Sequence, residues 1–156
     1  MKFNKIQSFA KINLTLKILK KLPNGYHEIE SLISKISLAD EILIKEVNGK
    51  KNKITFNGNF SSGISNSNTI SKLLKILIDQ NHIKNKKFNI KIKKNIPQSS
   101  GMGGGSMNAA SILNYFIKKK MIKTTKKGLI KIANKIGSDV ILGLYDSPVI
   151  LHGQQY

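Results

Sequence analysis

The sequence predicts a single α+β domain in which strands come first and most of the helices follow. Two observations support this prediction. Several segments place apolar residues at every second position, which is the spacing of a half-buried strand. Other segments repeat apolar residues three and four positions apart, which is the spacing of one buried helix face. Strand segments dominate the first half of the chain and helical segments the second, and this order favours an α+β arrangement.

The first strand is predicted over residues 10–17, because apolar and polar residues alternate there. One face carries Ala10, Ile12, Leu14 and Leu16, and the other carries Lys11, Asn13, Thr15 and Lys17. A strand of this kind buries its apolar face and leaves the polar face open. A turn is expected at residues 23–25, where proline, asparagine and glycine follow one another. Further strands are predicted at residues 29–36, 41–47 and 53–57, and then a polar loop at residues 57–67.

Three helices follow from apolar residues that recur with helical spacing, over residues 70–78, 109–117 and 129–136. The first helix is expected to begin near Asn68, and Thr124 or Thr125 is the expected N-cap of the third. Another alternating segment predicts a strand at residues 88–93. After Gly137 and Ser138 end the third helix, we expect a turn at residues 145–148 and a short strand at residues 149–151.

Composition excludes several classes of protein and site. The chain of 156 residues fits one domain, and its 40% of hydrophobic residues suffices for a core. The absence of cysteine excludes disulfides, thiolate zinc sites and a cysteine nucleophile. Apolar runs are too short to cross a bilayer, and residues 1–10 lack the apolar stretch of a secretory signal. We therefore expect a cytoplasmic protein without a membrane partner.

The formal net charge of +19 raises the question of a nucleic-acid partner. All 27 basic residues are lysine, whereas sequence-specific readout depends heavily on the forked guanidinium of arginine. Lysine, isoleucine and asparagine are all abundant, as expected when coding DNA is rich in A and T. We expect weak, salt-sensitive affinity for polyanions and no specific nucleic-acid partner. A basic RNA-binding or ribosome-associated domain is the alternative, and the aromatic content of 6% argues against it.

Residues 97–110 contain the most informative pattern, a glycine-rich stretch between a predicted strand and a predicted helix. Glycines let the backbone bend sharply and approach a ligand, and their N–H groups can then surround phosphate oxygens. The first turn of the following helix adds unpaired N–H groups. The stretch lacks the Gly-Lys-Ser/Thr ending of a P-loop and the third glycine of a dinucleotide fingerprint. It predicts a nucleotide-phosphate site, and a flexible surface loop is the alternative.

The same stretch resembles the second signature motif of the GHMP kinases, Pro-x-x-x-Gly-Leu-Gly-Ser/Gly-Ser-x-x-Ala. Four further family motifs are matched in order, at residues 10–14, 25–27, 67–70 and 137–140. Met102 stands where the family usually has leucine, and Met107 where it usually has a second serine. The resemblance implies the fold of the family's N-terminal domain. That fold is a mixed, largely antiparallel sheet with helices packed on one face, and it is similar to a ribosomal-protein domain.

The resemblance also implies an activity. The triple glycine and the motif Gly25-Tyr26-His27 are closest to the branch of the family that acts on a CDP-linked methylerythritol. Those kinases use ATP and Mg²⁺ to phosphorylate a hydroxyl of that compound in the non-mevalonate route to isoprenoids. A GHMP kinase acting on homoserine, mevalonate or a sugar is the alternative, and the Gly-Tyr-His motif argues against it.

Individual roles follow from the same resemblance. Lys11 and Asp139 are implied as the catalytic pair, Asn13, Tyr26 and His27 as substrate contacts, and Ser106 as a contact to Mg²⁺. The residues implied to bind ATP are Asn68, Pro97, Gln98, Ser99, Ser100, Gly101, Met102, Gly103, Gly104, Gly105, Ser106 and Met107. From the residues alone, Lys11 is one lysine among 27 and Asp139 is equally suited to a turn or a helix cap.

The family continues after the catalytic aspartate into a second domain that completes the substrate pocket. The resemblance therefore implies that residues 1–156 form the N-terminal ATP-binding domain and that the C-terminal domain is absent from this sequence. An apolar face that would meet that domain is then expected to be exposed. Residues 141–144 also depart from the family pattern, which is Val-Pro-Phe/Val-Phe after the aspartate.

Overall fold

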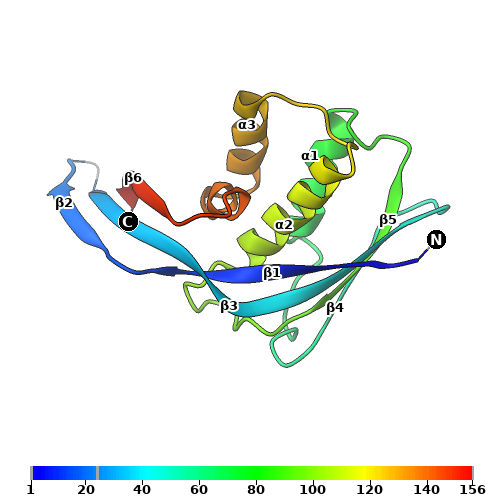
Figure 1. Ribbon diagram of the computed structural model, residues 1–156, viewed down its shortest axis with the longest axis horizontal. Coiled ribbons are helices and arrows are strands. Elements are labelled where there is room, and N and C mark those ends of the chain that lie inside the picture. The colour runs from blue at the N-terminus through cyan, green and yellow to red at the C-terminus, as the bar shows by residue number, and fades with distance from the viewer. Residues whose placement is uncertain (1, 24, 156) are drawn as a thin grey trace.

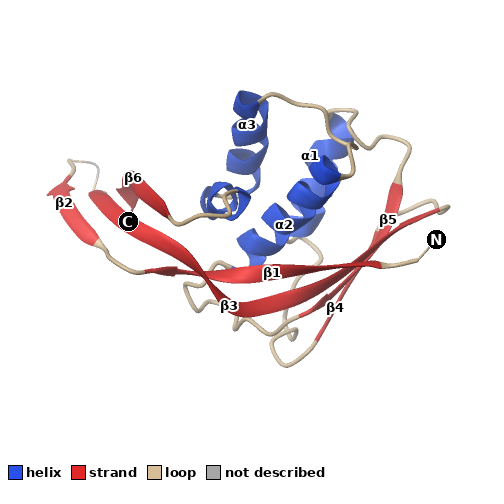
Figure 2. Ribbon diagram, in the orientation of Figure 1, coloured by secondary structure: helices blue, strands red, loops and turns tan. Residues whose placement is uncertain are grey.

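The structure, a computed structural model, describes residues 2–23 and 25–155. Within them, a six-stranded sheet carries its helices on one face (Figure 1 and Figure 2). The strands are β1 (Asn4–Asn13), β2 (Lys17–Lys21), β3 (His27–Val47), β4 (Lys53–Asn57), β5 (Lys87–Lys93) and β6 (Val149–Gln155). The helices are α1 (Thr69–Asp79), α2 (Gly104–Lys118), α3 (Lys126–Ile136) and the 3₁₀ helix η1 (Ser138–Leu144). The predicted α+β class and the one-sided helical layer are confirmed.

Strand β3 organises the sheet, because four of the other five strands pair with it. The strand order is β1-β3-β5-β4, and β2 and β6 also pair with β3 near its beginning. All of these pairings are antiparallel except that of β4 with β5, which is parallel. The sheet is therefore mixed, and its long central strand joins the end that carries β2 and β6 to the end under the helices (Figure 1).

A break in the alternation of β3 explains why the sequence predicted two strands where the structure has one. Ile29, Ser31 and Ile33 are buried in the first part, and Asp40, Ile42 and Ile44 in the second. Buried positions thus change from odd to even numbers. The pairing register with β1 shifts at the same point, between Phe9 and Lys11. A β-bulge of this kind turns the other face of the strand inward without interrupting it.

The prediction of a half-buried strand over residues 10–17 was wrong in its bounds. β1 ends at Asn13, and the chain bends before β2 begins. Ala10 is buried as expected, but Leu14 and Leu16 are 54% and 62% exposed. Apolar and polar residues still alternate after Asn13, but the chain there no longer lies beneath the helices. The apolar side chains at those positions are therefore exposed. The predicted turn at residues 23–25 includes Asn24, which lies outside the described residues.

The three helices share one main core with β3 and β5, in which α3 packs against α1, α2 and η1. The ring centroids of Phe88 on β5 and Phe116 on α2 lie 4.7 Å apart in its middle. Asn68 caps α1 through its side chain, and Thr125 caps α3, as predicted. α2 begins earlier than the spacing of its apolar residues indicated, at Gly104. No helix within the described residues combines the length and apolarity that a membrane crossing requires.

The face of the sheet opposite the helices carries charged side chains. Glu41 lies there and forms ion pairs with Lys5 and Lys93. The pKa of Glu41 is lowered from its ordinary value, chiefly because Lys5 donates a hydrogen bond to the carboxylate and adds positive charge beside it. Asp40, its neighbour in β3, points the other way and is fully buried beneath the helices.

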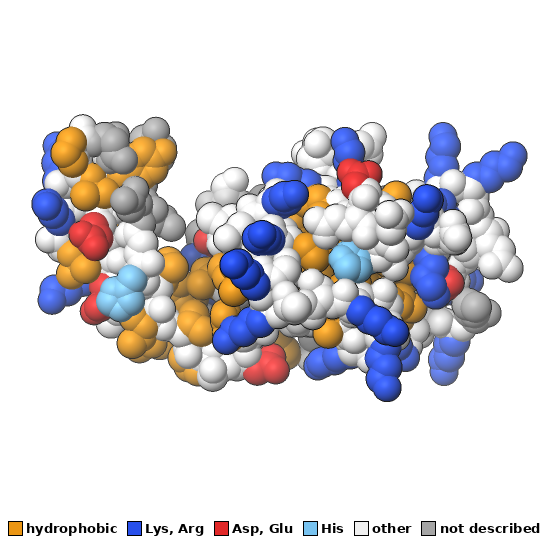
Figure 3. Space-filling model, turned by 90° about the horizontal axis from the view of Figure 1, so that it is seen from above, with side chains coloured by type: hydrophobic (Ala, Val, Ile, Leu, Met, Phe, Trp, Pro, Cys, Tyr) orange, Lys and Arg blue, Asp and Glu red, His pale blue; other side chains and the backbone are white. Residues whose placement is uncertain are grey.

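The molecule is hollowed between the end of the sheet with β2 and β6 and the helices, and hydrophobic side chains gather there (Figure 3). Several exposed large hydrophobic residues belong to this end: Leu14, Leu16, Ile18, Leu19 and Ile150. Lysines are spread across the same view and form no single stripe (Figure 3). Exposed apolar groups of this size are typical of a surface that contacts another part of a protein.

Candidate active site

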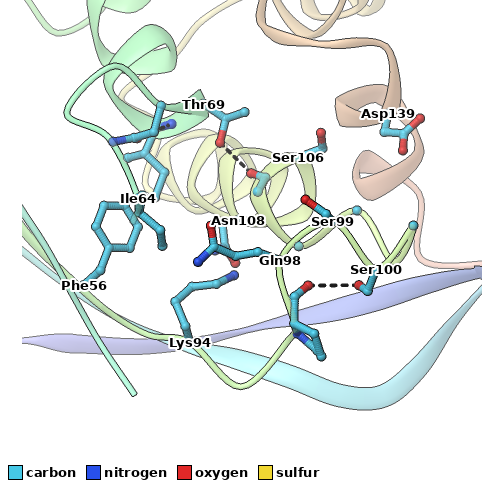
Figure 4. A pocket seen from close by; sticks show the side chains of 17 residues that line it. Phe56, Ile64, Thr69, Lys94, Gln98, Ser99, Ser100, Ser106, Asn108 and Asp139 are labelled. Carbon is cyan, nitrogen blue, oxygen red and sulfur yellow. Dashed lines mark hydrogen bonds between the residues drawn. The ribbon is translucent and has the colours of Figure 1, made fainter. Parts of the chain in front are cut away.

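The glycine loop, defined here as residues 94–103, joins β5 to α2 and borders a cavity of about 480 Å³. Every predicted ATP-binding residue except Met102 and Met107 lines this first cavity. Side chains that the sequence did not indicate also line it: Phe56, Ile64, Thr69, Lys94 and Asn108. Figure 4 shows them around an open space between the loop and the beginnings of two helices.

Two helix N-termini meet at the first cavity. α1 begins at Thr69 and α2 at Gly104, and the hydroxyl of Thr69 donates a hydrogen bond to the carbonyl of Gly105 at 2.7 Å (Figure 4). Both N-termini carry partial positive charge, and α2, which has no side-chain cap, also offers unpaired N–H groups, whereas Asn68 already accepts from N–H groups of α1. Because two of them face one space, the cavity favours an anionic ligand such as phosphate.

The glycine loop is shaped by close approach to the neighbouring side chains. Gly103 has a φ of +68°, and a Cβ atom there would lie 3.2 Å from Cγ of Lys11. A Cβ atom on Gly104 would lie 3.1 Å from Ile96 and 3.2 Å from Nζ of Lys94. The loop is also held from outside, because the amide of Gln98 donates to the carbonyls of Phe60 and Ser62. These contacts give the glycine-rich sequence one defined shape.

Lys11 and Asp139 lie together, as the resemblance implied. Nζ of Lys11 is 3.6 Å from Oδ2 of Asp139, and it donates a hydrogen bond of 3.0 Å to Oδ1 of Asn13. The Lys11 side chain is 11% exposed and that of Asp139 is 27% exposed. The backbone N–H of Lys11 donates to the carbonyl of Met102 at 3.0 Å. β1 and the glycine loop are therefore joined directly beside the two charged groups.

The orientation of the Asn13 amide is fixed by a buried serine. Oγ of Ser31 donates to the carbonyl of Thr15 at 2.6 Å and accepts from Nδ2 of Asn13 at 2.8 Å. Ser31 is fully buried. Because Nδ2 of Asn13 is engaged by Ser31, Oδ1 faces the ammonium of Lys11. This chain of hydrogen bonds holds Lys11 on the polar face of β1.

A second cavity of about 360 Å³ lies on the other side of Asp139. It is lined by polar and apolar side chains, among them Lys11, Asn13, His27, Ile29, Ile33 and Leu151. Asp139 and Gly101 line both cavities. The predicted substrate contacts Asn13 and His27 are thus together in this lining, which does not include Tyr26. Tyr26 is half-buried at the turn before β3, where its carbonyl accepts from the N–H of Leu22.

Met107 is buried in a small apolar cluster with Ile33 and Leu142, beneath α2. A Cβ atom on Gly143 would lie 3.1 Å from its sulfur. The methionine therefore packs against η1 and does not reach the first cavity. Ser106, in the first turn of α2, does line that cavity.

The described residues contain no group of three or more His, Asp or Glu side chains that could hold a metal ion. A magnesium ion commonly takes few protein ligands and several phosphate oxygens and waters. The hydroxyl of Ser106, in the lining of the first cavity, is an oxygen donor of the kind that Mg²⁺ prefers. A single protein donor of this kind fits an ion bound together with a nucleotide.

Sequence reasoning missed Lys94 and Asp40. Lys94 stands directly after the alternating segment of β5, and its side chain is 4% exposed and paired with Asp40. Nothing in the sequence separates it from 26 other lysines. Asp40 did carry a signal, because it is in phase with Ile42 and Ile44 on the apolar face of a strand. A carboxylate at such a position is buried and needs a partner.

A protein-family model for the GHMP kinases N terminal domain matches residues 68–154. The chain is 59% identical to 4-diphosphocytidyl-2-C-methyl-D-erythritol kinase of Pelagibacter ubique over 94% of its length, which is 52% of that relative. It is 38% identical to the kinase of the same name from Fervidobacterium nodosum, covering 96% of this chain and 51% of that one.

Two solved structures share the fold. One is a 4-(cytidine 5′-diphospho)-2C-methyl-D-erythritol kinase, with a TM-score of 0.79 and 24% identity, covering 96% of this chain and 52% of that chain. The other is a putative sugar kinase from Campylobacter jejuni, with a TM-score of 0.65 and 15% identity, covering 98% and 53%. The chain spans about half the length of the curated relatives it matches.

Proposed function

Because this chain belongs to the GHMP kinase family, we propose that it forms the ATP-binding half of a small-molecule kinase. Residues 1–156 are then one N-terminal domain of that enzyme. The observation that carries the proposal is the position of Asp139, which lines two cavities at once. One cavity has the glycine loop and two helix N-termini, which suit the phosphates of ATP. The other is open to an acceptor molecule.

The proposed reaction moves the terminal phosphoryl group of ATP to a hydroxyl that enters from the second cavity. Asp139 accepts the proton of that hydroxyl as the new phosphorus–oxygen bond forms. Lys11, 3.6 Å away, stabilises the negative charge on the transferring group. A Mg²⁺ ion held near Ser106 would bind phosphate oxygens and neutralise part of their charge. The bond to ADP breaks, and ADP leaves with the electron pair of that bond.

We propose that the acceptor is a CDP-linked methylerythritol, which is phosphorylated on a hydroxyl in isoprenoid precursor synthesis. The support is the name shared by the relatives at 59% and 38% identity. The second cavity adds further support, since the imidazole of His27 can form hydrogen bonds to the edge of a base. Apolar side chains of Ile29 and Ile33 offer a surface for the rest of the molecule.

Calorimetric titration of the purified chain with Mg-ATP, at two salt concentrations and with a short RNA as competitor, tests the ATP site. We expect saturable binding of one ATP per chain that persists in the presence of RNA. Absence of ATP binding together with strongly salt-dependent RNA binding would contradict the proposal. That result would favour the RNA-binding alternative, whose affinity comes from released counterions.

Asn68→Ala is expected to weaken both the fold and ATP binding. Oδ1 of Asn68 accepts from the N–H groups of Ile70 and Ser71 at 3.0 and 3.1 Å, and the residue lines the first cavity. Loss of an N-cap costs about 0.5–2 kcal/mol. Thermal unfolding and ATP titration measure the two effects separately.

Thr125→Ala is the matched control, because Thr125 caps α3 away from both cavities with one hydrogen bond of 3.1 Å to the N–H of Gly128. It should lower stability by a similar amount, about 0.5–2 kcal/mol, and leave the affinity for ATP unchanged. Equal ATP affinity in the two variants would remove Asn68 from the proposed ATP site.

A further inference from the structure

Asp40 is a fully buried carboxylate that has no part in the proposed transfer step. Burial of a charged group is costly unless the group is paired and hydrogen-bonded. Asp40 meets this requirement with four donors. Oδ1 accepts from the backbone N–H groups of Asn95 and Ile96 at 2.7 and 2.9 Å. Oδ2 accepts from Nδ2 of Asn108 at 3.0 Å and forms an ion pair with Nζ of Lys94.

These four donors flank the part of the chain that borders the first cavity. Lys94, Asn95 and Ile96 are the first three residues of the glycine loop, and Asn108 lies in α2, the helix that follows the loop. Asp40 therefore holds the beginning of the loop and the helix beyond its end to the same point of β3. Other hydrogen bonds also tie the loop to the sheet, such as those from the N–H of Lys94 to Asn57 and from the N–H of Lys11 to Met102, but neither of these orients the ammonium of Lys94.

Lys94 and Asn108 reach the cavity itself. Both line it, and Figure 4 shows their side chains next to each other at its floor. Nζ of Lys94 also lies 3.2 Å from the place where Gly104, the first residue of α2, would carry a Cβ atom. The ammonium is thus held beside the helix N-terminus, and its direction is set by the ion pair with Asp40.

We propose that Asp40 is a positioning residue for nucleotide binding, which acts by fixing Lys94 and the start of the glycine loop. The inference rests on the proposed ATP site. A buried ion pair is a poor source of stability, since apolar side chains of similar volume often serve as well or better. Orientation of groups at the wall of a ligand cavity is a role that an apolar pair does not fill.

The first test compares Asp40→Asn with Glu41→Gln in ATP titrations. Asp40→Asn keeps the shape of the side chain but brings an NH₂ group toward Lys94 and Asn108. Since a buried hydrogen bond to a charged group is lost, we expect the Kd for ATP to rise about tenfold or more. Glu41→Gln makes the same chemical change on the opposite face of β3, between Lys5 and Lys93, and should leave the Kd unchanged.

The outcomes separate this inference from the proposed function. If the unaltered chain binds no ATP, the proposed function fails. If it binds ATP and Asp40→Asn binds equally well, the ATP site stands and the role of Asp40 is refuted. A rise of the Kd in both Asp40→Asn and Glu41→Gln would mean that a general disturbance of β3 is responsible, and would also refute it.

A double variant distinguishes a positioning role of Asp40 from a merely structural one. The same variant also provides the test if Asp40→Asn alone does not fold. Asp40→Asn combined with Lys94→Met removes both charges of the buried pair, so the unpaired ammonium that destabilises the single variant is gone. We expect the melting temperature to recover toward that of the unaltered chain while the Kd for ATP stays about tenfold weaker. Recovery of both quantities together would overturn the proposal.

Discussion

Asp139→Asn should lower the turnover number about a hundredfold to ten-thousandfold, because an amide cannot take up the proton of the acceptor hydroxyl. Affinity for ATP should change little. Asp139 is 27% exposed, lies 3.6 Å from Nζ of Lys11 and borders both cavities, so its removal affects the transfer step more than the ATP site. Turnover is measured by introducing the substitution into a full-length kinase that carries this domain and phosphorylates the acceptor. ATP affinity is measured by calorimetry.

Asp146→Asn provides the matched control for this variant. Asp146 lies seven positions later, its side chain is 97% exposed, and it forms an ion pair of 3.7 Å with Lys35. The same chemical change there should leave turnover unaffected. If Asp139→Asn turned over as fast as the unaltered protein, Asp139 could not be the general base, and the two-cavity interpretation would lose its central residue.

Gly104→Val is expected to weaken ATP binding about tenfold to a hundredfold. Its Cβ atom would lie 3.1 Å from Ile96 and 3.2 Å from Nζ of Lys94, which is closer than ordinary contact. Overpacking of such a site costs about 1–3 kcal/mol, and the added methyl groups also occupy space at the helix N-terminus. Calorimetric titration with Mg-ATP gives the Kd, and thermal unfolding shows whether the fold survives.

Gly49→Val is the control for the introduction of a β-branched side chain. Gly49 lies between β3 and β4, where a Cβ atom would meet its nearest neighbours at an ordinary 3.8 Å. That variant should bind ATP like the unaltered chain. An unchanged Kd in Gly104→Val would refute the assignment of the glycine loop to the phosphates.

The local sequence pattern predicted the helices and strands well where the apolar positions of the pattern are also the buried positions of the structure. β4 was predicted with the bounds that it has, and Asn68 and Thr125 are the caps of their helices. The pattern misled where another constraint intervened. In β3 a bulge changes the buried positions from odd to even numbers, so the sequence pattern of one strand resembles that of two separate strands. At Leu14 and Leu16 alternation continued although the helical layer had ended.

The candidate site was predicted by motif, and its supporting contacts were not. Lys11 and Asp139 are 128 positions apart, so only the resemblance to a family could pair them in advance. Asp40 and Lys94 are brought together by the antiparallel pairing of β3 with β5, which places Glu41 opposite Lys93, and this pairing is not visible as a local pattern. Contacts that depend on how two distant segments of backbone meet cannot be predicted from periodicity or composition.

The pairing of β3 with β6 has a consequence for how the chain folds during synthesis. Residues His27 to Ile33 pair with residues Val149 to Gln155, so this part of the sheet closes across more than a hundred positions. Most domains form from the N-terminus as the chain leaves the ribosome, and long-range closure is slow. One edge of the first part of β3, residues 27–33, therefore stays unpaired until β6 has emerged from the ribosome. An open strand edge is prone to pair with other chains, and this is the segment where we expect a chaperone to be most useful.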